Sequence, residues 1–381
     1  MSTGLRCRFC LALTIALGWG GRPGLKAEEV VPRDLAVTDA KTNIAWYDAT
    51  KIGVEGKAWA DTASFYDRLP ARAEGRATAS VWGLSKHSAG MAVRFRTDSR
   101  TIQARWKLRS QNLAMPHMPA TGVSGLDLYG KGDDGRWSWI GAGRPTEFPQ
   151  NTASLASGLP SGEREYLVYL PLYNGVEQVE IGIASDATLK RDAAAGSRKP
   201  IVFYGTSITH GGCASRPGMA YPAILGRRFD RPTVNLGFSG SGKMEIEIAE
   251  LLGEIDAAAF VLDALPNMTP EMVAERAAPF VRRLRAARPD TPIALCEDRT
   301  FTNARWFEGT RDLHNKRRAE LRKAFDTLTA EGVKGLTLID GPSQLGEDGE
   351  DTVDGSHPTD LGFLRQADRF EKTLRDVLPK N

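Results

Sequence analysis

Ser207, Asp354 and His357 are the residues of this chain whose types and spacing suit nucleophilic chemistry. Ser207 follows the apolar run of residues 200–204 and stands among glycines, in a sharp turn that can hold a hydroxyl at the rim of a sheet. The alternative is a glycine turn that carries a serine cap. Asp354 lies three residues before His357, so one turn can bring its carboxylate to one imidazole nitrogen while the other nitrogen faces the serine.

Two further polar segments come from the same half of the chain. The segment "NLGFSGSGK" (235–243) is a glycine-rich turn, and "LDALPNMTP" (262–270) supplies Asn267. Acyl transfer through serine needs a base, a carboxylate that orients the base, and hydrogen-bond donors for the oxyanion. Together with "GTSITHGG" (205–212) and "DGSHPTDLG" (354–362), these segments offer a candidate for every role.

The elements that must position these segments alternate between strands and helices. Helical patterns cover residues 243–255, 270–289 and 313–332, and the predicted strands are "PIVFYG", "PTVNLG", "AAFVLDA", "TPIALCE" and "LTLID". Strands that are apolar throughout and alternate with helices form a parallel sheet covered on both faces. Ligands bind such sheets at the carboxyl ends of the strands, so we expect the polar segments to meet there.

The preceding part of the chain has a different period. From Trp46 to Ile183, short segments such as "MAVRFRT" and "TIQARWKLR" alternate apolar and polar residues between glycine turns, which indicates a β-sandwich. Residues 186–198 are small and charged, as in a linker. We therefore predict an N-terminal β-sandwich domain at 40–185, a linker at 186–198 and an α/β domain at 199–379.

The N-terminus has the pattern of a secretory signal. Arg6 and Arg8 precede the apolar stretch "FCLALTIALGW", which is too short to span a membrane, and Ala27 ends the predicted signal (1–27). We expect a secreted or periplasmic protein without stable membrane insertion, in which Cys213 and Cys296 are two buried thiols rather than a bridge. A net charge of +3 without a basic block argues against nucleic acid as a partner.

The four polar segments, taken in order, resemble the SGNH (GDSL-type) hydrolases through "GTSIT", "NLGFSG", "LPNM" and "DGSHP", over residues 199–378. This resemblance implies a flavodoxin-like three-layer α/β sandwich with Ser207 as nucleophile, His357 as base and Asp354 as its partner. It also implies an oxyanion hole made by the Ser207 N–H, the Gly240 N–H and the Asn267 side chain. This mechanism needs no cofactor, and the scattered histidines, with no cysteine pair of ligand spacing after residue 27, indicate no metal site. The segment 124–141 resembles the GxDLY β-domain that accompanies such hydrolases.

The match departs from the commonest family pattern at two places. Thr206 stands where aspartate is usual, and "LPNM" replaces "GxND"; both resemble a subgroup with a "GTSITxG" first block. Asn267 has a second interpretation as a helix cap, although Thr269 followed by Pro270 already makes a good helix start.

Other histidines compete for the role of base. His210 is three residues from Ser207 but has no carboxylate nearby in sequence, so we expect it to line the cleft or cap a turn. His314 is predicted on a helix surface, and His87 and His117 belong to the β-domain.

Two other classes of function need to be considered. The segment Gly237–Met244 matches a phosphate-binding loop except at Met244, which replaces the hydroxyl residue that holds magnesium. A secreted glycan-binding protein with an inert hydrolase domain is the other alternative, although such a scaffold has no need for all five site residues.

The expected substrate is a small-molecule or polysaccharide ester. Secretion and four tryptophans in or beside the predicted sandwich favour short acyl esters on carbohydrate, because exposed aromatic faces can stack on sugar rings; the four are Trp82, Trp106, Trp137 and Trp139. A general esterase or lipase acting on lipid or small-molecule esters is the alternative. The sequence leaves the oligomeric state open.

Overall fold

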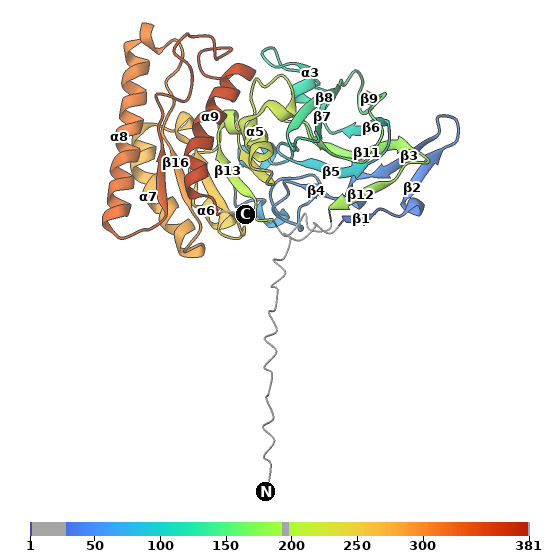
Figure 1. The fold of residues 1–381 in the computed structure, drawn as a ribbon. Helices are drawn as coiled ribbons and strands as arrows, with labels where there is room; N and C mark the ends of the chain where they lie inside the picture. The colour runs from blue at the N-terminus through green and yellow to red at the C-terminus, as the bar shows by residue number, and fades with distance from the viewer. Residues whose placement is uncertain (2–27, 193–197, 380–381) are drawn as a thin grey trace.

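The computed structural model describes Met1, residues 28–192 and residues 198–379. The predicted signal segment therefore lies, apart from Met1, outside the described residues. Two bodies pack side by side, a β-domain formed by the N-terminal half and an α/β domain formed by the C-terminal half (Figure 1). In the part of the chain that the structure describes, no helix combines the length and apolar character that a membrane crossing requires.

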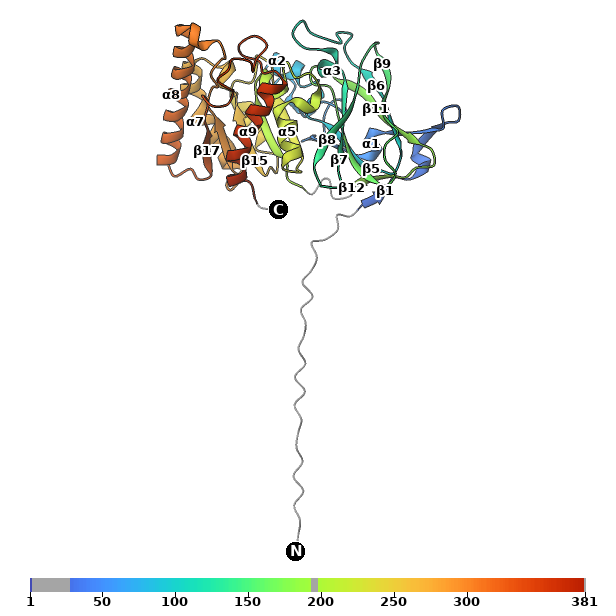
Figure 2. The same ribbon diagram turned by 45° about the horizontal axis from the view of Figure 1, so that its top comes forward.

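The β-domain contains two antiparallel sheets that face each other (Figure 2). One sheet has the order β1 (Glu28–Val30), β12 (Leu189–Asp192), β5 (Ala92–Thr97), β10 (Arg164–Tyr169), β7 (Leu126–Lys131), β8 (Trp137–Gly143), with β4 (Val54–Glu55) paired to β5. The other has the order β2 (Ala36–Asp39), β3 (Ile44–Asp48), β11 (Val176–Ala184), β6 (Thr101–Leu108), β9 (Gln150–Ser157). Alternating side chains from both sheets, such as Phe95, Trp106, Leu128 and Ile181, form one buried core.

The structure differs from the prediction at the domain boundary. Leu189–Asp192, inside the predicted linker, form strand β12, which pairs with β1 and β5. Of its four residues only Leu189 is apolar, and it is buried in the core of the β-domain, so the strand shows no apolar period in the sequence. Strands β1 and β2 likewise extend the β-domain below residue 40.

The α/β domain has five parallel strands in the order β14 (Thr233–Gly237), β13 (Ile201–Gly205), β15 (Ala259–Asp263), β16 (Ile293–Cys296), β17 (Leu336–Ile339). This order, second-first-third-fourth-fifth, is the flavodoxin-like one. Its switch point lies between β13 and β15, where a ligand site is expected. The fold class expected from the sequence is confirmed.

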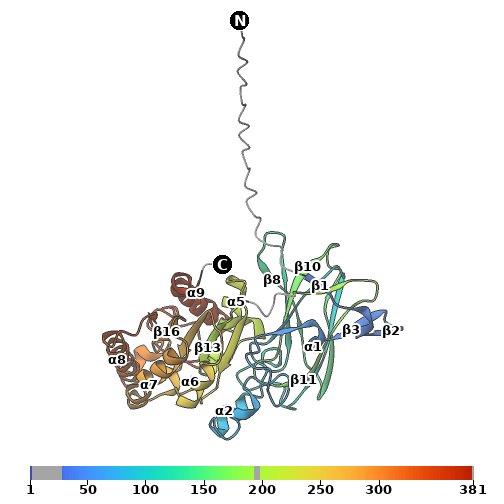
Figure 3. The ribbon, with the colours of Figure 1, turned by 90° about the horizontal axis from the view of Figure 1, so that it is seen from below.

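Helices cover both faces of this sheet (Figure 3). On one face, α5 (Tyr221–Arg228) and α9 (Asp360–Val377) pack on Ile201 and Phe203. On the other, α6 (Ile246–Leu252), α7 (Pro270–Ala287) and α8 (Glu308–Ala330) share a core with Val202 and Tyr204. Burial on both faces explains why these strands are apolar throughout.

Short helical elements complete the described chain. In the β-domain they are α1 (Ala49–Ile52), α2 (Ala79–Leu84), α3 (Ala120–Val123), η1 (Arg33–Leu35) and η2 (Ala71–Ala73). In the α/β domain they are α4 (Ser207–His210), η4 (Pro217–Met219), η5 (Leu265–Asn267) and η6 (Ala304–Trp306).

Candidate active site

Ser207 begins a one-turn helix at the carboxyl end of strand β13, which pairs with β14 and β15. Thr206 caps this helix by accepting a hydrogen bond from the Ile208 N–H, and Gly211 ends it with a φ of 107°. A side chain is disfavoured at that φ, so glycine permits the tight exit from the turn. The strand therefore delivers Ser207 to the rim of the sheet, where its side chain is only 8% exposed.

A hydrogen-bonded relay joins the three residues singled out by type and spacing. The Ser207 hydroxyl lies 2.8 Å from His357 Nε2, and His357 Nδ1 lies 2.8 Å from Asp354 Oδ2. Because the carboxylate accepts the Nδ1 proton, Nε2 is left as the acceptor for the serine hydroxyl. The arrangement can remove the serine proton during attack on a carbonyl.

Asp354 is held as a carboxylate. Partial burial acts to raise its pKa, but hydrogen bonds from the His357 backbone, the His357 ring and the Ser356 backbone outweigh this and lower the pKa to about 2. The group is therefore charged at any pH at which a neutral imidazole can act as a base.

The two predicted oxyanion residues meet in one turn beside Ser207. Phe238 N–H donates to the Gly205 carbonyl, and Gly240 occupies the turn 238–242 with a φ of 67°. The Asn267 amide reaches the Phe238 and Gly242 carbonyls of this turn at 3.4 and 3.3 Å. Within the described residues, neither the Ser207 N–H nor the Gly240 N–H donates to another protein group, so both are available to an oxyanion.

Asn267 does not cap helix α7. Thr269 is the N-cap, accepts from the Met272 N–H, and is followed by Pro270 at the first helical position. The prediction that Thr269 and Pro270 start this helix is confirmed. The Asn267 amide, expected to be free for an oxyanion, donates in this structure to the turn carbonyls.

The loop after β16 supports the backbone next to His357, a contact not predicted from the sequence. The buried Arg299 donates to the Ser356 carbonyl at 3.0 Å, and the Thr302 N–H donates to the Gly355 carbonyl at 3.1 Å. Both contacts fix the backbone directly before His357. The sequence signal for this contact is the charged segment "EDRT" directly after an apolar strand, because it places Arg299 at the carboxyl edge of the sheet.

The β-domain closes the back of the site with Tyr173. Its hydroxyl donates to the Ser207 carbonyl at 3.2 Å and hydrogen-bonds the Ser239 side chain, and its ring stacks on His210 at 4.2 Å. His210 donates from Nε2 to the Leu172 carbonyl at 2.7 Å and is fully buried. It therefore neither lines the cleft nor contacts the Ser207 hydroxyl. From the same domain, His117 lies at the rim, with its ring 6.2 Å from that of His357.

The prediction of a surface position for His314 was wrong. Its ring is 1% exposed, and Nδ1 lies 2.7 Å from Asp298 Oδ2 in a buried pair beneath the loop after β16. Helical periodicity alone does not reveal a polar residue that packs inward onto a carboxylate. Cys213 and Cys296 are separate buried thiols, as predicted.

The "GLDLY" segment forms the junction between the domains. Asp127, fully buried, accepts from Arg216 and from the Gly218 N–H of the α/β domain, both at 2.9 Å. Arg216 also donates to Tyr129. The aspartate and tyrosine of this segment therefore hold the loop that follows helix α4.

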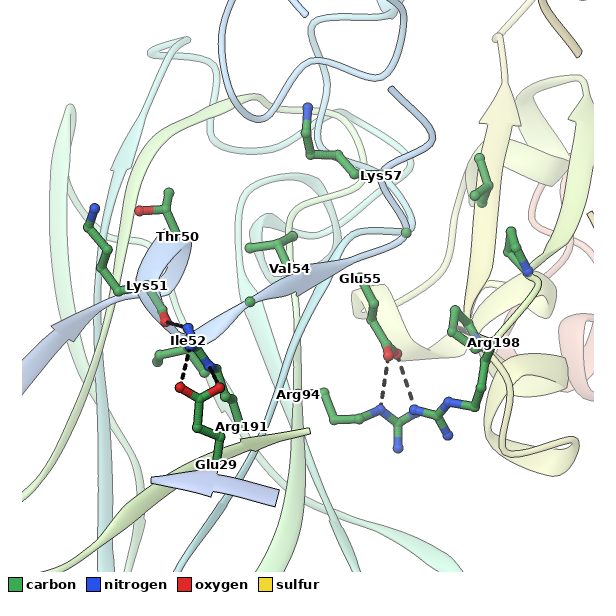
Figure 4. A pocket seen from close by; sticks show the side chains of 15 residues that line it. Glu29, Thr50, Lys51, Ile52, Val54, Glu55, Lys57, Arg94, Arg191 and Arg198 are labelled. Carbon is green, nitrogen blue, oxygen red and sulfur yellow. Dashed lines mark hydrogen bonds and ion pairs between the residues drawn. The ribbon is translucent and has the colours of Figure 1, made fainter. Parts of the chain in front are cut away.

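A pocket of about 470 Å³ lies between the domains but away from the site (Figure 4). It is lined by Pro200, Pro232 and Val234, at the amino ends of β13 and β14, and by residues 50–57 of the β-domain. Its side wall includes Glu55, which accepts from Arg94. Ser207, Asp354 and His357 lie beyond the opposite, carboxyl edge of the sheet.

Comparison with known proteins agrees with the fold and the residue pattern. The sequence model of the GDSL-like Lipase/Acylhydrolase family matches residues 198–375, and that of the GxDLY domain, described as the N-terminus of Esterase_SGNH_hydro-type proteins, matches residues 44–189. A protein from Bacteroides ovatus ATCC 8483, described as a GDSL-like lipase, is 36% identical with a TM-score of 0.82, over 88% of this chain and 98% of that one. The chain belongs to the GDSL (SGNH) hydrolase family. It is an ester-cleaving hydrolase.

More distant structures share this hydrolase's fold. A salicylyl-acyltransferase from a tetracycline biosynthetic pathway is 19% identical with a TM-score of 0.69, over 91% of this chain and 98% of that one. A family two carbohydrate esterase from Clostridium thermocellum, in complex with cellohexaose, is 14% identical with a TM-score of 0.53, over 76% and 92%. No curated protein sequence matched the chain.

Proposed function

We propose that this GDSL hydrolase is a secreted serine esterase that removes short acyl groups, chiefly acetyl, from carbohydrate. The observation that carries the serine mechanism is the unbroken relay from Ser207 through His357 to Asp354, with both hydrogen bonds at 2.8 Å. The proposal that the protein is secreted rests on the sequence pattern of residues 1–27 alone.

The proposed reaction has two stages. The Ser207 oxygen attacks the ester carbonyl while His357 takes the hydroxyl proton, and the N–H groups of Ser207 and Gly240 stabilise the oxyanion. The Asn267 amide is the third donor, in exchange for its long contacts to the Phe238 and Gly242 carbonyls. The alcohol leaves with the proton from His357. Water, deprotonated by the same imidazole, then releases the acyl group.

The first test replaces the nucleophile. Ser207→Ala is expected to lower kcat on p-nitrophenyl acetate by about 10⁴-fold or more, because the covalent step is lost. A fluorophosphonate probe should label the parent at Ser207 and leave the variant unlabelled. A variant as active as the parent would remove the serine mechanism.

Exposed aromatic rings support the carbohydrate substrate. Of the four tryptophans considered from the sequence, Trp106 is fully buried, Trp82 and Trp137 are partly buried, and Trp139 is 51% exposed. Trp306, which was not considered, is 72% exposed on η6, in the loop that contacts the backbone next to His357. The fold is compatible with a sugar substrate, since the carbohydrate esterase named above shares it.

The second test separates sugar esters from lipid esters. A series of p-nitrophenyl esters from acetate to decanoate is assayed beside acetylated xylan and other acetylated glycans. We expect the highest kcat/KM on acetate and release of acetate from at least one glycan. Preference for octanoate or longer chains with no glycan turnover would instead assign a general esterase or lipase.

A further inference from the structure

Arg68 is a buried cation that the β-domain inserts into the α/β domain. It lies between β4 and η2, is 3% exposed, and its guanidinium approaches strand β14 rather than any strand of its own domain. Among the residues the structure describes, no carboxylate pairs with it; the neighbouring Asp67 pairs with Lys86 and Arg109 instead. A buried charge without a counter-ion must be held by dipoles.

Backbone carbonyls hold this charge. Nη1 donates to the Asn235 and Gly237 carbonyls at 3.1 and 2.8 Å. On the β-domain side, Nη2 donates to the Leu84 carbonyl at 2.7 Å and Nε to the His87 carbonyl at 3.0 Å. Strand β14 is the edge of the parallel sheet, so the guanidinium takes the place of a further strand along its last residues.

The carbonyls that Arg68 holds lead directly into the oxyanion turn. Gly237 is followed by Phe238, whose ring lies 4.9 Å from the guanidinium carbon and whose N–H donates to the Gly205 carbonyl. Asn235 also donates from its side chain to the Thr209 carbonyl at 2.7 Å, within the nucleophile helix. Arg68 therefore contacts the strand end that fixes where the turn carrying Gly240 begins.

We propose that Arg68 is a positioning residue for the oxyanion hole, through which the β-domain sets the direction of the Gly240 N–H relative to Ser207. The inference rests on the proposed function and deepens it, since it assigns the β-domain a part in the chemistry. A planar guanidinium is suited to this task, because it presents five donors in a fixed plane and spans four carbonyls that the single ammonium of lysine does not.

The test is Arg68→Lys, assayed on p-nitrophenyl acetate per site labelled by the fluorophosphonate. We expect kcat to fall by about 10²-fold with little change in KM, because a small displacement of the oxyanion donors weakens transition-state binding only. The pH profile should keep its shape, since the His357–Asp354 pair is untouched.

Arg94→Lys is the matched control: Arg94 is equally buried, contacts Asp230 of the α/β domain, and does not touch the oxyanion turn. Its kcat should match the parent.

A double-mutant cycle with Asn267→Ala distinguishes positioning from general destabilisation. Both residues act on the turn 238–242, so the loss from Arg68→Lys should be smaller when Asn267 is already absent. If Arg68→Lys does not fold, Phe238→Leu replaces it in the cycle, because it removes only the ring beneath the guanidinium. Parental kcat, or a loss that is fully additive with Asn267→Ala, would overturn the proposal.

Ser207→Ala is measured in parallel to separate the two levels of inference. If it remains active, the serine mechanism itself fails, whatever Arg68 does. If it is inactive while Arg68→Lys turns over like the parent, only the role of Arg68 is lost.

Discussion

Three side chains carry the proposed chemistry, and the position of one proton decides whether they can act. Asp354 accepts from His357 Nδ1, so the imidazole presents an unprotonated Nε2 to the Ser207 hydroxyl. Asp354 and His357 are the first and last residues of a four-residue loop segment. The Asp354 carboxylate also accepts hydrogen bonds from the backbone N–H groups of Ser356 and His357. The carboxylate therefore fixes both the loop and the tautomer.

Asp354→Asn tests this assignment. The amide keeps the shape but removes the charge and can donate to the ring, which favours the wrong tautomer, so kcat should fall by about 10²- to 10⁴-fold. In the parent, Asp354 should contribute no ionisation to the profile of kcat/KM against pH near neutrality, because its pKa is about 2 and it is charged throughout. Parental turnover in the variant would show that another group orients the ring.

The same carboxylate gives a stability prediction with a definite sign. Its pKa is lowered on folding, so its ionised form stabilises the native state above the ordinary aspartate pKa, and this contribution is lost as pH falls through about 2. Urea unfolding of the parent and Asp354→Asn should thus differ at pH 7, with the difference closing toward pH 2. A gap that stays constant with pH would contradict the low pKa.

At the scale of elements, the loop after β16 contacts the backbone before His357 and presents an exposed aromatic ring. Its Thr302 N–H donates to the Gly355 carbonyl, and four residues later Trp306 presents a 72% exposed ring. An exposed large aromatic next to an active-site loop is typical of a ligand-binding surface.

Trp306→Ala should therefore raise KM on acetylated xylan by about tenfold, while kcat/KM on p-nitrophenyl acetate stays near the parent value, since a small ester does not reach the ring. Acetate release from the polymer and p-nitrophenol release are measured with the same enzyme samples. Trp139→Ala, on β8 of the β-domain, is the comparison variant for the other exposed ring. Equal loss on both substrates would place Trp306 in the fold rather than in substrate binding.

The elements that sequence predicts well are those whose own residues determine their burial. The five parallel strands are apolar throughout because both faces are covered, so their runs stand out. Strand β9 ("QNTASLAS") shows no clear alternation of apolar and polar residues, and pairing with β6 holds it in the sheet. Strand β12 falls inside the predicted linker because only Leu189 among its residues is apolar.

The site residues also fall into those that the sequence predicts and those that it does not. Ser207, Gly240, Asn267 and the pair Asp354–His357 follow strand ends within recognisable blocks, so their order in sequence predicts their convergence. Arg68 contacts Gly237 across 169 residues, and Tyr173 contacts Ser207 across 34. Only the packing of the two domains brings these groups together, and no local period encodes it.

At the scale of the whole molecule, the two domains share a core rather than a thin interface. A segment of the β-domain contributes buried side chains to the same cluster as α6 and α7 of the α/β domain; they are Trp59, Leu69, Ala73, Ala77 and Val81. Arg68 and the Asp127–Arg216 pair add buried polar contacts across the junction. Bodies that share buried contacts on this scale are expected to unfold together.

Leu69→Ala tests this coupling. Leu69 is fully buried at the junction, so the substitution should cost about 2–5 kcal/mol of unfolding free energy through lost burial and a cavity. Because the junction belongs to both domains, calorimetry of parent and variant should each show one transition. Esterase activity and the circular dichroism of the β-sandwich should be lost at the same temperature, lower in the variant. Leu35→Ala is the control. Leu35 belongs to η1 and is 41% exposed, so its substitution should change the free energy of unfolding by less than about 0.5 kcal/mol. Two separate transitions, with activity lost while the β-sandwich remains folded, would show that the α/β domain unfolds independently and that the shared core does not couple the domains.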